Sequence, residues 1–127
     1  MLRSTIAMPA KQFTFSKGRR LTKSAEFAQV KQNGRAEHGR LLLLGVLAVN
    51  NADPFRAGFI TSRAVGSAAP RNRVRRRLRE IVRRHQHEIL AGRWIVTIAR
   101  ASAAKASYEQ LEGEWLRLAK RASILAA

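Results

Sequence analysis

The sequence predicts an α/β (α+β) two-layer sandwich, in which helices cover a small central sheet. Its 127 residues allow one compact domain with a modest core, so residues 1–127 are expected to form a single domain. Helical periodicities and apolar strand-like runs alternate in the order helix, strand, strand, helix, strand, helix, and no internal repeat is visible. Residues 1–14 have no periodicity and are expected to form a mobile basic tail.

The first three elements are predicted from caps and apolar runs. A short helix should begin at Ser24 as its N-cap and end at Gly34, which would take the left-handed conformation. Two strands over 41–49 and 55–62 follow, joined by the turn residues 50–54. Because 41–49 is apolar on both faces, it is expected to be a central strand covered on both sides.

The second half contains the two longest helices. After a loop over 63–70, in which Gly66 can adopt an unusual backbone angle, a helix should run from Pro70 to about residue 91. Its apolar residues fall on one stripe, namely Val74, Leu78, Ile81, Val82 and Ile89. A strand over 94–99 and a helix over 107–125 complete the chain, and Ser107 with Gln110 predicts a capping box.

The charge is the strongest feature of the composition. Lys and Arg number 25 against 8 Asp and Glu, giving a formal net charge of +17. Such a charge repels itself unless a polyanion neutralises it, so nucleic acid is the expected partner and an anionic membrane surface the alternative. The longest apolar run, 41–49, is too short to span a bilayer. The absence of cysteine excludes thiolate zinc sites, and with no secretory signal over 1–10 a cytoplasmic location is expected.

Two segments carry most of this charge. Residues 1–35 hold eight basic residues and one acid, and residues 71–84 hold eight arginines and one acid. The second segment opens the central helix, where free N–H groups and the positive end of the helix dipole already attract phosphate. The alternative, a merely solvated basic face, is disfavoured because arginines at i, i+4 spacing repel one another.

This segment carries a family signature. The string Arg63-Ala64-Val65-Gly66, followed by Pro70-Arg71-Asn72-Arg73-Val74-Arg75-Arg76-Arg77-Leu78-Arg79-Glu80, closely resembles the Arg-Asn-Arg motif of the protein subunit of bacterial ribonuclease P. Weaker likenesses at 20–27, 56–59 and 95–100 occur in the family's order. The resemblance implies a fold similar to domain 2 of ribosomal protein S5, with a left-handed βαβ crossover.

The resemblance also implies a division of labour. The RNA subunit would cleave precursor tRNA with bound Mg²⁺, and the protein would supply no catalytic residue, bind no metal or other cofactor, and act as a monomer bound 1:1 to ribonuclease P RNA. It implies RNA-subunit contacts by Arg71, Asn72, Arg73, Arg75, Arg76 and Arg79. It implies a cleft for the 5′ leader of precursor tRNA, with Phe27, Lys31 and Arg63 as candidate residues.

Two positions of the expected cleft depart from the family. Lys31 and Gly45 stand where relatives often have aromatic residues, so this cleft should depend less on base stacking and more on phosphate pairing through Lys31. Phe27 has two interpretations, as a stacking residue or as a core residue of the first helix, and the sequence does not separate them.

No protein-based active site is predicted. His85 and His87 lie on nearly opposite sides of a helix and cannot share a metal, although His85 should be partly buried. Glu109, Glu112 and Glu114 resemble the polar face of a helix rather than paired catalytic carboxylates. Alternative functions are a structural RNA-binding protein of ribosomal type, a DNA-binding module, whose base-reading residue types this helix lacks, and a membrane-surface helix.

Overall fold

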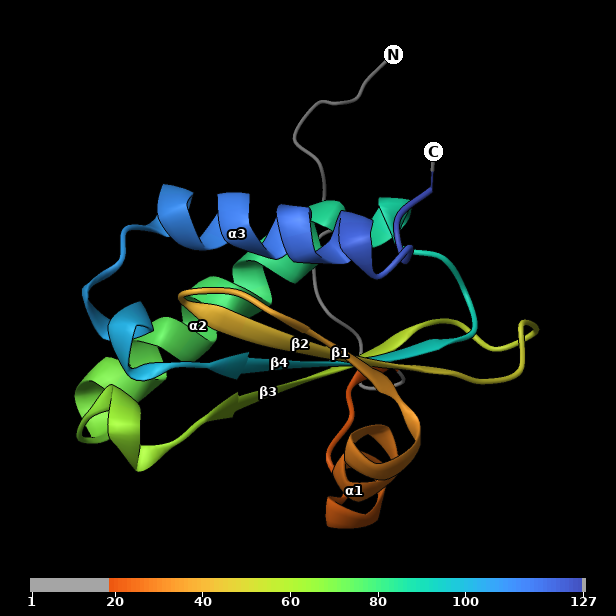
Figure 1. Cartoon of the computed structure of the whole chain (residues 1–127), viewed down its shortest axis with the longest axis horizontal. Helices are drawn as coiled ribbons and strands as arrows, with labels where there is room; N and C mark the ends of the chain where they lie inside the picture. Colours follow the sequence, from red (N-terminus) through yellow and green to blue (C-terminus); the bar gives the residue numbers. More distant parts are fainter. Residues whose placement is uncertain (1–18, 127) are drawn as a thin grey trace, which may run out of the picture.

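The computed structural model describes residues 19–126, and the tail expected at 1–14 lies outside them. Figure 1 shows a sheet seen edge-on with helices above and below it. With η marking 3₁₀-helices, the elements are α1 (Ser24–Asn33), β1 (Arg35–His38), β2 (Leu42–Ala48), β3 (Arg56–Thr61), η3 (Arg63–Val65), α2 (Ala68–His85), η4 (Gln86–Glu88), β4 (Arg93–Ala99), η5 (Ala101–Lys105) and α3 (Tyr108–Arg121).

The four strands form one sheet in the order β1-β2-β4-β3. β2 pairs antiparallel with both β1 and β4, whereas β3 and β4 are parallel and are joined through α2. The helices α2 and α3 lie on one face of this sheet, and α1 lies on the other (Figure 1). The predicted α/β class with a small central sheet is therefore confirmed.

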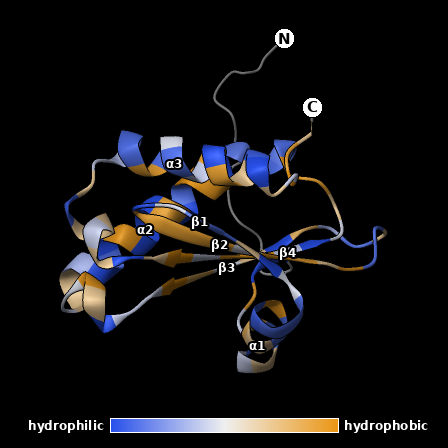
Figure 2. Ribbon diagram, in the orientation of Figure 1, coloured by the Kyte–Doolittle hydropathy of each residue, from blue (hydrophilic) through white to orange (hydrophobic). Residues whose placement is uncertain are grey.

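The main core lies between the sheet and the α2/α3 pair. The predicted stripe on α2 is buried, with Val74, Leu78, Ile81 and Val82 each at most 1% exposed. On α3 the fully buried Trp115 occupies the centre, and its indole Nε1 donates to Thr97 Oγ1 on β4 at 3.2 Å. Figure 2 shows apolar strands beneath these helices, whose outer surfaces are hydrophilic.

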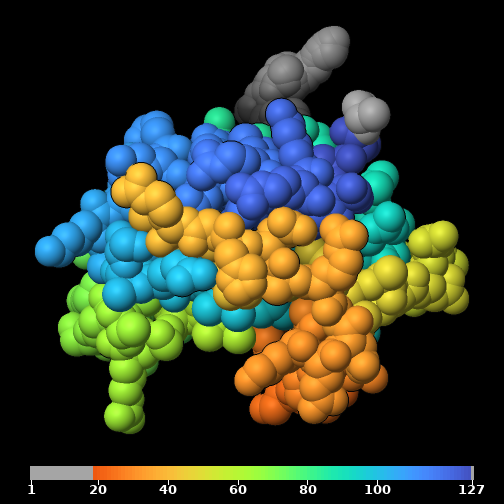
Figure 3. All heavy atoms as spheres, viewed as in Figure 1, coloured from red at the N-terminus to blue at the C-terminus, as the bar shows by residue number. Residues whose placement is uncertain are grey.

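The opposite face of the sheet has a much smaller core. Its buried residues are Leu21, Val30 and Val96, with half-buried neighbours such as Phe27 around them. In the space-filling view α1 projects from the body of the molecule instead of merging with it (Figure 3). The sheet is thus covered on both faces, as expected for β2, but unequally.

Three local predictions for α1 and the strand that follows it were wrong or incomplete. The strand β1 was not expected, because Arg35–His38 has no apolar alternation and pairs through its backbone at the sheet edge. Ser24, the predicted N-cap, is instead the first residue of α1. The N-cap is Lys23, whose N–H donates to the Glu26 carboxylate at 3.1 Å. Gly34 is extended, with φ −92°, and glycine is needed because a Cβ would lie 2.5 Å from the Val46 carbonyl oxygen.

Both long helices end earlier than predicted. α2 stops at His85 and tightens into η4, and α3 stops at Arg121 before Ser123, whose φ is 59°. The chain beyond each helix then pairs, through the antiparallel bridge between Ile89 and Leu125. Ile89 and Leu125, which were expected in the last turns of the two helices, lie instead in two short extended segments that pair with each other.

Two predicted end signals are confirmed. Ser107 Oγ accepts from the Gln110 N–H at 3.1 Å, and Gln110 Oε1 accepts from the Ser107 N–H at 2.9 Å, which is the capping box. Gly66 has φ +136°, a conformation that residues with a Cβ rarely adopt. It lets the chain turn sharply between η3 and α2, which brings the start of α2 next to the end of β3.

The interpretation of Glu114 as a polar-face residue was wrong. Its side chain is 4% exposed, and Oε2 accepts from the backbone N–H groups of Leu41 and Leu42 at 2.6 and 2.7 Å. The carboxylate thus satisfies the first donors of β2 and attaches α3 to the sheet. Glu112 is half-buried against His85, and Glu109 remains exposed as expected.

Candidate nucleic-acid interface

The first turns of α2 carry the predicted arginine cluster. Ser67 precedes the helix without a side-chain cap, and the N–H groups of Ala68 and Ala69 open it. Asn72, Arg73, Arg76 and Arg79 are exposed, whereas Arg71 and Arg75 are half-buried. The six residues that the resemblance implies as RNA-subunit contacts therefore lie on the outer surface of one helix.

The arginines of α2 differ in how they are neutralised. Within residues 19–126 no carboxylate forms an ion pair with Arg71, Arg73, Arg75, Arg76 or Arg79. Near the C-terminal end, Arg83 pairs with Glu80, and Arg84 lies 3.9 Å from a Glu112 oxygen. The uncompensated charge is therefore confined to the first part of the helix.

Neutral acceptors hold Arg75 in place. Its Nη2 donates to Thr61 Oγ1 at 2.7 Å, and its Nη1 donates to Asn72 Oδ1 at 3.1 Å. Asn72, the central residue of the motif, thus orients a neighbouring guanidinium without cancelling its charge. The buried Nε of Arg71 has no hydrogen-bond acceptor within residues 19–126.

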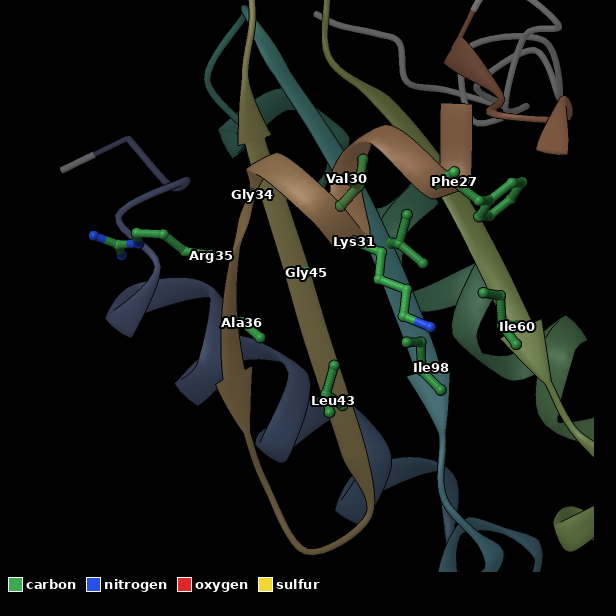
Figure 4. Close-up of a pocket in the computed structure, with 12 residues that line it drawn as sticks. Phe27, Val30, Lys31, Gly34, Arg35, Ala36, Leu43, Gly45, Ile60 and Ile98 are labelled. Atoms are coloured by element: carbon green, nitrogen blue, oxygen red, sulfur yellow. The ribbon is translucent and has the colours of Figure 1, made fainter. Parts of the chain in front are cut away.

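The second predicted region is a pocket of about 440 Å³ between α1 and the sheet. Its floor is apolar and comes from β2, β3 and β4, and Figure 4 shows Leu43, Ile60 and Ile98 on it. Lys31 extends from α1 across the pocket, whereas Arg35 points away from it (Figure 4). A cationic amine therefore lies above an apolar surface.

Close glycine contacts determine how α1 sits over this floor. A Cβ at Gly58 would lie 2.6 Å from the Phe27 ring, so glycine allows that ring to lie against β3. A Cβ at Gly45 would lie 3.2 Å from Val30 Cγ1. Phe27 is half-buried against the smaller core and also lines the pocket. Its position is therefore compatible with both interpretations, a packed residue of the first helix and a residue of the cleft wall.

The predicted cleft residues do not all meet. Phe27, Lys31 and Gly45 line the same pocket. Arg63 lies in η3, beyond the end of β3, exposed and outside the pocket lining. The structure therefore brings together two of the three predicted cleft residues, and the two departures from the family pattern face each other across it.

Sequence reasoning missed a clasp that holds α1. Arg56 on β3 forms an ion pair with Glu26, donates from Nη2 to the Arg20 carbonyl at 2.7 Å, and stacks over Trp94 with its Cζ 5.5 Å from the ring centroid. Burial alone would raise the pKa of Glu26, but hydrogen bonds from the Lys23 N–H, Arg56 and the Thr22 N–H lower it. The only sequence signal was the charge of Arg56 in an otherwise apolar strand.

No metal centre or membrane span emerges in the described part of the chain. Residues 19–126 contain no group of three or more His, Asp or Glu side chains that could hold a metal ion. Within the same residues, no helix is both long and apolar enough to cross a membrane. His85 is partly buried, as predicted, and its two ring nitrogens lie 2.9 Å from Glu88 and 2.8 Å from Glu112.

A basic α/β domain with unpaired arginines in the first turns of α2 and a lysine above an apolar cleft has the features of a polyanion-binding protein. The family model "Ribonuclease P" matches residues 15–123. This chain belongs to the ribonuclease P protein family, as its Arg-Asn-Arg motif predicted.

Relatives support this assignment. The "Ribonuclease P protein component" of Syntrophomonas wolfei is 38% identical over 108 residues, which cover 84% of this chain and 89% of the relative. That of Halalkalibacterium halodurans is 36% identical and covers 86% and 92%.

Solved structures agree with the fold. The Staphylococcus aureus RNase P protein superposes with a TM-score of 0.78 at 29% identity, covering 86% of this chain and 99% of its own. The Thermotoga maritima RNase P protein gives a TM-score of 0.73 at 26% identity, covering 80% and 96%.

Proposed function

We propose that this protein binds the RNA subunit of ribonuclease P through the first turns of α2, and the 5′ leader of precursor tRNA in the cleft under α1. Family membership makes it a ribonuclease P protein component, acting in 5′ maturation of tRNA. The observation that carries the finer proposal is the separation of two binding surfaces, an arginine helix on one face of the sheet and an apolar cleft on the other.

The charge on α2 supports the assignment of the RNA subunit to this helix. Among the described residues no carboxylate pairs with Arg71, Arg73 or Arg76, so RNA phosphates can approach them without displacing an acidic side chain of this part of the chain. Guanidinium groups bind phosphates through two parallel hydrogen bonds, which fixes orientation as well as adding affinity. The folded RNA subunit, which presents many phosphates in fixed positions, suits such a surface.

The cleft suits a single-stranded leader. Its apolar floor can accept unstacked bases, the Phe27 ring offers one stacking surface, and Lys31 can pair with a phosphate between them. Because Gly45 and Lys31 replace two aromatic residues, we assign most of the leader affinity to Lys31 and the apolar floor. Arg63, outside the pocket, would meet the RNA beyond it.

Chemistry is assigned to the RNA subunit and its Mg²⁺. The described residues offer no cluster of carboxylates or imidazoles for the ion, so the proposed work of the protein is binding and orientation. We further propose that one monomer binds one RNA in the cytoplasm.

The test is reconstitution of the full-length protein with its cognate ribonuclease P RNA and precursor tRNA at low Mg²⁺. Added protein should raise the cleavage rate, because it neutralises phosphate repulsion and holds the leader. The double variant Arg71→Ala/Arg73→Ala should weaken RNA-subunit binding by about tenfold or more, the effect of losing charged hydrogen bonds. Its melting temperature should stay near that of the native protein, because neither side chain belongs to the core stripe.

A matched control removes the same charge elsewhere. Lys120→Ala/Arg121→Ala deletes two exposed cations from α3, outside both proposed surfaces. It should weaken binding much less. Unchanged cleavage on addition of native protein would favour a structural RNA-binding protein and contradict the proposal, as would equal losses in the two double variants.

A further inference from the structure

A third surface lies at the sheet edge, between the two proposed RNA-binding surfaces. Three arginines surround a pocket of about 210 Å³: Arg20 from the segment before α1, and Arg75 and Arg79 from successive turns of α2. We call it the edge pocket, and its other lining residues are Leu21, Thr22, Ala57, Gly58 and Phe59. Arg20 was not among the residues predicted from the sequence to contact RNA.

The walls of the edge pocket are fixed by backbone pairing and side-chain hydrogen bonds. The Leu21 N–H donates to the Ala57 carbonyl at 2.9 Å, so the segment before α1 continues the sheet beside β3. Arg56 holds the Arg20 carbonyl at 2.7 Å. Thr61 and Asn72 hold Arg75, as described above. The backbone of Arg20 and the guanidinium of Arg75 are thus set before any ligand arrives.

The pocket concentrates positive charge. None of its lining residues is acidic, and the nearest carboxylates along the chain, Glu26 and Glu80, pair with Arg56 and Arg83. The pKa of Arg79 is lowered by burial and further by the charges of Arg20 and Arg75. Arg79 is therefore repelled by both Arg20 and Arg75 in the folded chain, and an anion beside it would relieve that repulsion.

We propose that the edge pocket binds a single phosphate group, held by Arg20, Arg75 and Arg79. Guanidinium forks match the oxygen geometry of a tetrahedral phosphate, and the apolar walls from β3 strengthen each ionic hydrogen bond by excluding water. Gly58 links this pocket to the cleft, because the Phe27 ring and the Leu21 side chain both pack against it.

The position of the pocket suggests which phosphate would use it. It lies between the arginines of α2 and the cleft under α1, so an RNA backbone passing from one surface to the other would cross it. This attribution to RNA rests on the proposed function, whereas phosphate binding itself does not.

The test of the site uses the isolated full-length protein titrated with inorganic phosphate, with chloride keeping the ionic strength constant. Arginine Nε–H resonances report binding by nuclear magnetic resonance. Arg20→Gln and Arg79→Gln should each weaken phosphate binding by about tenfold or more, the effect of losing one charged hydrogen bond. Arg121→Gln, which removes an arginine from α3, should change it less than about twofold.

Equal weakening in all three variants, or a titration that never saturates, would show a diffuse ionic effect and overturn the site. Circular dichroism checks that each variant folds. If Arg79→Gln does not fold, the exposed Arg20, with Arg20→Lys as the charge-preserving comparison, decides the question.

Two RNA measurements on Arg20→Gln then identify the source of the phosphate. Weaker binding of the ribonuclease P RNA assigns it to the RNA subunit, whereas a smaller preference for precursor over mature tRNA in the holoenzyme assigns it to the leader. No change in either measurement assigns the site to free phosphate. Failure of the proposed function would appear in reconstitution alone, because the phosphate titration requires no RNA.

Discussion

The two faces of the sheet are built in different ways. On the α2/α3 face, apolar side chains from two helices interlock with the strands around the fully buried Trp115. On the α1 face, three of the described residues form the buried cluster, and the helix is held largely by close glycine contacts and the Arg56–Glu26 clasp. One face therefore supplies stability, and the other leaves an apolar surface accessible.

The same contrast appears in the charges. On α2 the inner side is apolar and the exposed arginines face outward, so the helix can bind RNA without giving up core contacts. On α1 the residues that contact the sheet also line the pocket, so packing and binding compete for the same side chains. A binding cleft of this kind requires a helix that does not fill it.

The largest expected effect is on the free energy of unfolding, when an aromatic side chain is truncated on each face of the sheet in turn. Trp115→Ala should lower the free energy of unfolding by about 3–5 kcal/mol, because it empties the centre of the core. Phe27→Ala should lower it by about 1 kcal/mol, because the ring is only half-buried. Phe27→Ala should in turn weaken precursor binding by about 1–3 kcal/mol, the contribution of one stacked base.

Urea unfolding and precursor-binding titrations measure these two quantities. Phe27→Leu is the control that keeps apolar packing and removes the aromatic face. A stability loss for Phe27→Ala as large as that for Trp115→Ala, with unchanged precursor affinity, would show that the two faces do not divide the work.

Sequence patterns predicted elements on both faces of the sheet, including α1 on the smaller core, and they failed where an element has no apolar face. The stripe of α2 has a helical period because it packs on a sheet, so its residues could be assigned from spacing alone. The strand β1 could not, because Arg35–His38 has no apolar face and depends on backbone pairing with β2. Glu114 was misassigned because its acceptor role depends on Leu41 and Leu42, far away in the sequence.

In the candidate site, too, roles that depend on contacts between distant parts of the sequence could not be predicted. The arginine surface of α2 follows from local sequence, and Phe27 and Lys31, which the resemblance assigned to one cleft, line the same pocket. Arg63 lies elsewhere, because η3 carries it past the end of β3. Arg20 and Arg56 gain their roles only when the segment before α1 pairs with β3, a contact that no periodicity encodes.

A smaller effect is expected from the clasp that holds α1. Glu26→Gln keeps the shape of the side chain but removes its charge, and should lower the free energy of unfolding by about 1 kcal/mol at pH 7, the difference between charged and neutral hydrogen bonds. Since the folded pKa of Glu26 is depressed, its contribution is present above the ordinary value of 4.5 and is lost as the pH falls through the folded pKa.

Urea unfolding at pH 7 and at decreasing pH below 4.5 tests this dependence. The difference between the native protein and Glu26→Gln should shrink toward zero at the acidic end. A difference that stays constant would mean that the carboxylate charge does not hold α1. Glu109→Gln, an exposed carboxylate on α3, is the matched control and should show little difference at either pH.

The smallest expected effect lies on the stable face, at His85. Burial lowers the pKa of this imidazole, but hydrogen bonds to Glu88 and Glu112 raise it above its ordinary value of 6.5 overall. Arg84 also lies near Glu112, and the buried Trp115 ring stacks against the imidazole at 6.4 Å. The protonated form therefore joins α2 to α3, and its contribution is fully present below pH 6.5 and lost as the pH rises through the folded pKa.

Melting temperatures measured from pH 6 upward at constant ionic strength should fall for the native protein. His85→Gln, which keeps a hydrogen-bonding side chain without a charge, should remove that fall, whereas His87→Gln, an exposed neighbour, should not. A fall that persists in His85→Gln would assign the pH dependence to another group. The α2/α3 face would then owe its stability to apolar packing and to the Glu114 carboxylate, without an ionic contribution from His85.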